Sequence, residues 1–146
     1  MASENEKNAE AIFDLADAAS NISYGIQNLL DQRFNSIEKE YYAVSDTVKD
    51  INNFVKDTVK KSELYKKLEY ADEFIDPCFG AGFYLNQIIF NVKNANELWS
   101  SNGPWALAEN AWNVSPEEMK KVLFKIKEDF DIFSHYAGKC AAKYKD

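Results

Sequence analysis

Residues 37–55, IEKEYYAVSDTVKDINNFV, carry the pattern that decides the fold class. Apolar residues recur there at steps of four and three, and almost all residues between them are charged or polar. The recurring residues are Ile37, Tyr41, Val44, Val48, Ile51 and Val55. This period places them on one face of an α-helix. We expect that face to meet the protein's own core, with a second copy or a different partner as the alternatives.

The same helical period recurs along the rest of the chain. Four long helices are predicted, over residues 4–33, 36–61, 80–101 and 116–143. At 1.5 Å per residue they are all about 33–45 Å long, and matched lengths suit an antiparallel bundle. The 146 residues include only 5 Gly and 3 Pro, which are few helix breakers. The sequence therefore predicts one all-α domain over residues 1–146, an antiparallel bundle of four long helices with one or two short extra helices.

The first two predicted helices could also be continuous. A single helix over residues 12–59 would be ~70 Å long, whereas a compact chain of this size is ~40 Å across. Asn35 and Glu38 form a capping-box pattern that favours a break near residues 34–36. The apolar phase continues from Ile26 to Ile37 and favours the elongated alternative. We expect the break.

Local signals mark where the later helices begin. Ser115, Pro116 and Glu118 form a capping box with proline in the first helical position, which predicts the start of the last helix. Pro77 and the glycines after it predict a loosened backbone before the third helix. The apolar set of that third helix is Phe83, Leu85, Ile88, Ile89, Val92 and Leu98.

Composition limits the classes of partner and compartment. The net charge of −7 disfavours binding to nucleic acid or to an anionic membrane, and it is compatible with a basic protein surface. The first residues show no secretory signal, and no apolar window is long enough to span a bilayer, so we expect a cytoplasmic protein. Cys78 and Cys140 match no metal or redox spacing and are expected to be reduced.

No catalytic or metal-binding motif stands out. His135 is the only histidine and is interpreted as a surface or boundary residue, while Ile132 breaks the Glu-x-x-His pattern of di-iron bundles. Acidic and basic residues that alternate along one helix indicate a solvated face; they are Asp46, Lys49, Asp50, Lys56 and Asp57. We expect no enzymatic activity, no cofactor and no metal.

Two apolar features are candidate partner-binding sites. Trp99, Trp105 and Trp112 flank a Gly-Pro turn, and tryptophan is enriched in interface hot spots. Tyr42 and Phe54 widen the apolar stripe of residues 37–55. The alternatives are that the tryptophans seal one end of the bundle and that the wide stripe only faces the core.

These features predict a non-enzymatic protein-binding module that docks on another protein with a basic surface. Its most specific form is a small acidic inhibitor or immunity-type protein. One alternative is a carrier of an apolar small molecule, held by aromatic residues inside the bundle: Phe83, Tyr84, Phe90, Phe130 and Phe133. Another is a self-assembling structural subunit, for which a homodimer is the simplest form.

Overall fold

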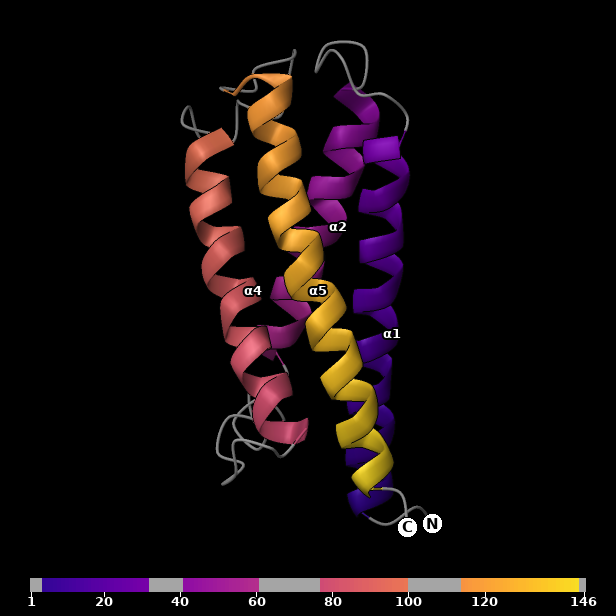
Figure 1. The fold of residues 1–146 in the computed structure, drawn as a ribbon. Helices are drawn as coiled ribbons and strands as arrows, with labels where there is room; N and C mark the ends of the chain where they lie inside the picture. The colour runs from indigo at the N-terminus through magenta and orange to yellow at the C-terminus, as the bar shows by residue number, and fades with distance from the viewer. Residues whose placement is uncertain (1–3, 32–40, 61–76, 100–113, 145–146) are drawn as a thin grey trace.

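The computed structural model describes residues 4–31, 41–60, 77–99 and 114–144, and these ranges contain four α-helices (Figure 1). The helices are α1 (Glu4–Asp31), α2 (Tyr41–Lys60), α4 (Pro77–Trp99) and α5 (Pro116–Tyr144). They run alternately up and down, so that α1 begins at the end of the bundle where α5 ends (Figure 1). The predicted antiparallel all-α bundle of four long helices is confirmed. The predicted short helices fall on residues outside the described ranges.

The chain reverses direction between α1 and α2, because these helices lie antiparallel (Figure 1). Two helices, rather than one continuous helix over residues 12–59, are therefore confirmed. The expected break at residues 34–36 and its capping pair, Asn35 and Glu38, lie outside the described residues.

The apolar stripe of α2 faces the core of the bundle. Val44, Val48 and Ile51 are buried, and Val55 is partly buried against the same core. The expectation that the stripe faces the protein's own core is confirmed for these residues.

The helix α5 is the most extensively packed of the four. Its main neighbours are α1 and α4, whereas α2 makes smaller contacts with those same two helices. The helices α1 and α4 therefore occupy opposite corners of the bundle (Figure 1). One apolar stripe of α5 is fully buried, whereas Phe124 on the same helix is 51% exposed. The stripe consists of Met119, Leu123, Ile126, Phe130, Phe133, Ala137 and Cys140, and it gives α5 the largest share of the core among the described helices.

The start of α5 follows the predicted capping chemistry. The backbone N–H of Glu118 donates to Ser115 Oγ at 3.2 Å, and Pro116 is the first residue of the helix. Ser115 thus satisfies one of the N–H groups that a helix start leaves without an intrahelical acceptor.

Small residues allow α1 and α5 to approach closely. Ala16 and Ala19 of α1 are buried, and Ser134 Oγ of α5 donates to the Ala16 carbonyl oxygen at 2.9 Å. The buried hydroxyl of Ser23 donates to the carboxylate of Asp131, which also accepts from Lys127 Nζ at 2.7 Å. Side chains of α5 therefore reach both the backbone and a buried hydroxyl of α1.

The helix α4 begins at Pro77, three residues before the predicted start. Proline is well accommodated in the first turn because its missing N–H is not needed there. Gly80 does not loosen the backbone. A Cβ atom at this position would lie 2.8 Å from Cγ of Tyr136, so the glycine leaves room for that ring beside α4. The Tyr136 ring also stacks on Tyr84, with centroids 5.9 Å apart.

The apolar set of α4 divides between the core and the surface. Leu85, Ile88 and Val92 are buried, whereas the side chains of Phe83 and Leu98 are each 48% exposed. The helix instead fills the core with smaller residues, Ala81 and Ala95, and with Trp99 at its end. Apolar character along α4 is thus no guide to which face is buried.

Cys140 is buried and disulfide-bonded, which contradicts the expectation of reduced cysteines. The other cysteine in the sequence is Cys78. A disulfide restricts the unfolded chain and stabilises a small domain by about 2–4 kcal/mol.

Among the described helices, none is long and apolar enough to cross a membrane.

Candidate functional site

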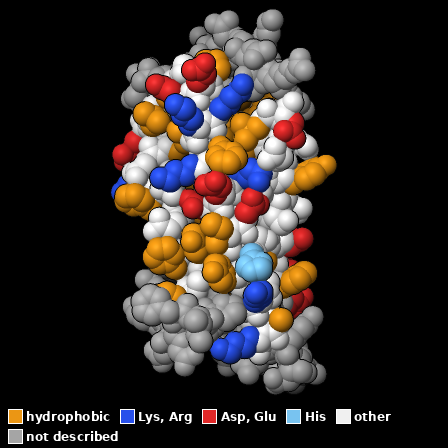
Figure 2. All heavy atoms as spheres, viewed as in Figure 1, with side chains coloured by type: hydrophobic (Ala, Val, Ile, Leu, Met, Phe, Trp, Pro, Cys, Tyr) orange, Lys and Arg blue, Asp and Glu red, His pale blue; other side chains and the backbone are white. Residues whose placement is uncertain are grey.

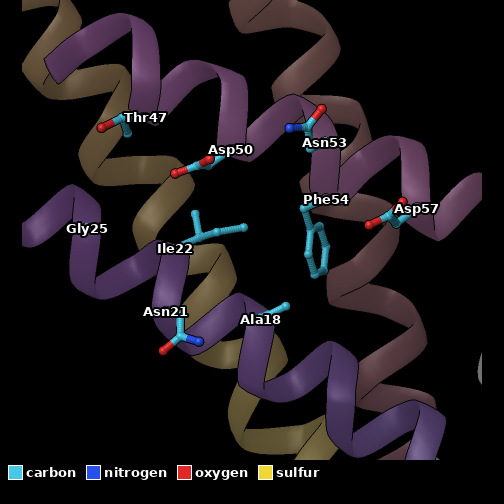
Figure 3. A pocket seen from close by; sticks show the side chains of 9 residues that line it. All are labelled: Ala18, Asn21, Ile22, Gly25, Thr47, Asp50, Asn53, Phe54 and Asp57. Atoms are coloured by element: carbon cyan, nitrogen blue, oxygen red, sulfur yellow. The ribbon is translucent and has the colours of Figure 1, made fainter. Parts of the chain in front are cut away.

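A groove of about 340 Å³ lies between α1 and α2 and is called the α1–α2 groove (Figure 3). It follows from how the bundle packs, because α1 is held against α5 and presents small residues toward α2. Its lining comprises Ala18, Asn21, Ile22 and Gly25 of α1 with Thr47, Asp50, Asn53, Phe54 and Asp57 of α2. Nothing lies within 4 Å of a Cβ atom built on Gly25, so the α1 side of the groove is open there.

The apolar part of the groove is held rigidly by the core. Phe54 is buried, and its ring meets the rings of Phe130 and Phe133 edge to face, at centroid distances of 5.0 and 6.0 Å. Ile22 is partly buried on the facing side. Aromatic pairs in this geometry are attractive beyond their buried area, so the Phe54 ring is fixed in place.

The polar part of the groove is acidic. Asp50 and Asp57 are exposed and lie seven residues apart on α2, about 10 Å along the helix axis. Neither carboxylate forms an ion pair within the described part of the chain, and no Lys or Arg is among the lining residues. The Thr47 hydroxyl donates to the Ala43 carbonyl at 2.9 Å. The two carboxylates therefore remain available as acceptors.

The acidic character continues onto the outer face of α1. Glu10, Asp14 and Asp17 are exposed there, and Phe13, between them in sequence, is 59% exposed. The sequence of α1 contains a single basic residue, Lys7, and several acidic ones, which are Glu4, Glu6, Glu10, Asp14, Asp17 and Asp31. Most of the net negative charge of the described helices thus belongs to α1, one of the two helices that form the groove.

The predicted partner-binding residues do not form one surface. Tyr42 is 81% exposed at the start of α2, but Phe54 and Trp99 are buried. Burial removes Phe54 and Trp99 from a directly exposed binding face, although Phe54 does contribute to the groove. Trp105 and Trp112 lie outside the described residues.

Trp99 is integrated into a polar contact between α2 and α4. Its indole N–H donates to Asn96 Oδ1 at 3.1 Å. Asn96 in turn exchanges hydrogen bonds with Asn52, at 2.7 and 3.3 Å. This burial agrees with the alternative in which the tryptophan belongs to the end of the bundle.

The aromatic residues expected for a small-molecule carrier do not surround one cavity. Phe130 and Phe133 are fully buried in the core, whereas Phe83 and Phe90 are exposed on α4. Tyr84 is partly buried and stacks on Tyr136. These five side chains therefore give no common pocket for an apolar ligand.

His135 is exposed on α5, and its ring meets Tyr136 edge to face at 5.6 Å. Its sequence neighbour Ser134 donates to the backbone of α1 and not to the imidazole. Within the described residues, no group of three or more His, Cys, Asp or Glu side chains is arranged to hold a metal ion. The interpretation of His135 as a surface or boundary residue is confirmed.

One carboxylate away from the groove has an altered pKa. Burial at the α4–α5 contact raises the pKa of Asp129 above its ordinary value, and the hydrogen bond from Asn91 partly opposes this rise. Asn91 Nδ2 donates to Asp129 Oδ2 at 2.5 Å. This pair joins two helices and lies outside the groove lining.

Sequence reasoning treated the acidic residues of α2 as part of a mixed, solvated face. The steps from Asp46 to Asp50 and then to Asp57 are four and seven residues, which keep them on one edge of the helix. In α1, Ala18 and Gly25 are likewise seven residues apart. These two spacings were the available signal for an acidic edge opposite a small-residue edge.

Comparison of the chain with protein-family models, with curated proteins and with solved structures finds no match.

Proposed function

We propose that the protein is a non-enzymatic binding module that accepts basic side chains of a partner protein in the α1–α2 groove. The observation that carries this proposal is that Asp50 and Asp57 line an open groove whose lining contains no Lys or Arg, and that neither forms an ion pair among the described residues. If the groove covers a basic functional surface of the partner, the partner is inhibited, and this chain acts as an inhibitor or immunity-type protein.

The groove combines the two features that bind a lysine or arginine side chain. Carboxylates pair with the charged head group, and apolar surface packs against the aliphatic stem. Asp50 and Asp57 supply the first feature, and Ile22 with Phe54 supplies the second. A flat acidic surface would lack the apolar contact.

The small free energy of a single ion pair indicates that several contacts must act together. One exposed ion pair contributes only about 0.2–1 kcal/mol, so two carboxylates alone do not produce tight binding. Exposed Glu10, Asp14 and Asp17 extend the acidic surface along α1. They increase the rate of encounter with a basic partner more than they increase affinity.

The cellular compartment bears on the choice of partner. The cytoplasmic localisation expected from the sequence remains a prediction. The disulfide at Cys140 favours an oxidising compartment instead, because structural disulfides are rare in the cytosol.

The test is affinity capture from native extract with three forms of the tagged chain. The groove variant carries Asp50→Asn and Asp57→Asn, and the control carries Glu117→Gln and Glu128→Gln on α5, which removes the same amount of charge. The wild type should retain a stoichiometric partner that is lost at high salt. The groove variant should bind that partner about tenfold more weakly, and the control should bind it as the wild type does.

A further variant separates shape from charge. Gly25→Leu fills the open α1 side of the groove without changing the charge. It should weaken binding to the same partner. Equal binding by all forms would show that the partner docks elsewhere and would refute the proposal.

A further inference from the structure

The outer face of α4 is apolar and exposed. Phe83 and Leu98 are each 48% exposed and Phe90 is 60% exposed. Figure 2 shows hydrophobic side chains on the side of the molecule where α4 lies, as well as over the middle of this view. Phe83 and Phe90 are seven residues apart and so lie on one face of the helix.

This face is also nearly free of charge. Between Pro77 and Trp99 the only charged residues are Lys93 and Glu97, which cancel. The whole chain has a net charge of −7, so α4 differs sharply from α1. Amide residues occupy the outward positions between the apolar ones, among them Gln87 and Asn94.

We propose that a second copy of the chain covers this face, with the two α4 helices antiparallel about a two-fold axis near Phe90. Like charges repel, so two acidic chains approach more readily through a face without net charge, and α4 combines this neutrality with exposed apolar side chains and only two charged residues. A basic partner would gain little here, because the face offers one carboxylate and one ammonium group. This inference is independent of the function proposed for the α1–α2 groove.

The side-chain pattern is complementary to itself under that symmetry. With the axis near Phe90, Phe83 of one copy lies opposite Leu98 of the other, and Gln87 lies opposite Asn94. Each of these contacts occurs twice, as a two-fold interface requires. The stretch from Phe83 to Leu98 is about 22 Å long, enough for four turns of each helix to pack.

The dimer leaves the α1–α2 groove accessible. Because α1 and α4 occupy opposite corners of the bundle, the two α1 helices would face away from the axis. A single pair of helices is a small interface, so the expected dissociation constant is on the order of micromolar.

The test is the mass of the full chain by light scattering, from about 5 to about 500 µM, which spans a micromolar dissociation constant. The wild type should approach twice the chain mass as concentration rises. Phe90→Glu places two carboxylates at the axis and should keep the chain monomeric. Phe13→Glu is the matched control, since Phe13 is 59% exposed on the opposite corner, and it should dimerise as the wild type does. Circular dichroism establishes that each variant remains helical.

A charge pair tests the antiparallel register without removing an aromatic ring. Gln87→Lys combined with Asn94→Glu leaves the net charge unchanged and places opposite charges across the proposed axis. It should tighten the dimer several-fold at low salt, whereas Gln87→Glu combined with Asn94→Glu should weaken it. A monomeric wild type at every concentration would refute the proposal. So would a dimer that Phe90→Glu leaves intact or a charge pair that has the opposite effect.

Discussion

The α5 side and the α2 side of the bundle are built from the same kinds of residue but pack differently. On the α5 side, Ser134 bonds to the α1 backbone and the Tyr136 ring lies against Gly80 of α4. On the α2 side, an asparagine pair joins α2 to α4, and an open groove separates α2 from α1. From this difference we expect α5 to contribute more to stability than α2, which packs less extensively and borders the open groove.

Equivalent truncations on the two sides should have different effects on stability. Ile126 of α5 and Ile51 of α2 are both fully buried, so Ile126→Ala and Ile51→Ala remove the same atoms. We expect Ile126→Ala to lower the free energy of unfolding by about 3–5 kcal/mol and Ile51→Ala by about 2–3 kcal/mol. The cost is smaller at Ile51 because α2 has fewer neighbours and can move into the cavity. Urea denaturation measures both values.

Equal losses at the two isoleucines would break the comparison. They would mean that α2 is held as firmly as α5 despite the groove. A larger loss for Ile51→Ala than for Ile126→Ala would reverse it and place the main stabilising contacts on α2.

Two glycines sharpen the same contrast. At Gly80 an added methyl group would meet the Tyr136 ring, whereas at Gly25 it would meet nothing within 4 Å. We expect Gly80→Ala to destabilise the protein by about 1–3 kcal/mol through overpacking. Gly25→Ala should stabilise it by about 0.5–1 kcal/mol, because alanine favours the helix. Thermal unfolding of both variants shows whether each substitution raises or lowers the stability.

A double substitution identifies the cause of the Gly80 effect. In a Tyr136→Ala background the ring is gone, so adding Gly80→Ala should cost little or nothing further. If Gly80→Ala remains equally destabilising without the ring, contact with Tyr136 is not what requires glycine.

Much of the fold was predictable because the apolar period of 3.6 residues is strong in α2 and α5. Val44, Val48 and Ile51 are buried as that period predicts. It failed in α4, where apolar residues occur on every side and Phe83 and Leu98 are exposed. The apolar period identifies the buried face of a helix only when polar residues occupy the opposite face. In α4 only two residues are charged, so the exposed face is not marked.

The candidate site was less predictable than the fold. Tryptophan and wide apolar stripes suggested a partner surface, yet Trp99 and Phe54 complete the core. The groove depends on how α2 packs beside α1, which packs more extensively against α5 than against α2. Sequence periodicity does not show which neighbouring helix each helix packs against most extensively.

The smallest expected effect concerns the pH dependence of the α4–α5 contact. Burial raises the pKa of Asp129, so the folded protein binds this proton more tightly than the unfolded chain does. The contribution of Asp129 to the free energy of unfolding is therefore greatest at low pH. This contribution declines as the pH rises from the pKa of an unfolded aspartate, near 3.9, through the raised pKa of the folded state. The asparagine pair between α2 and α4 does not titrate, so the α2 side lacks an equivalent contribution.

Asp129→Asn should remove this dependence while its side-chain oxygen still accepts the hydrogen bond from Asn91. At pH 7 the variant should match or exceed the wild type by up to about 1 kcal/mol, and the gain should vanish near pH 4. Glu128→Gln should give part of the same gain, because the Glu128 charge also raises the pKa of Asp129. Urea denaturation at both pH values measures these differences. An Asp129→Asn variant that is less stable at pH 7 would show that the ionised carboxylate binds Asn91 strongly enough to outweigh its burial. The polar contact on the α5 side would then stabilise the bundle through charge.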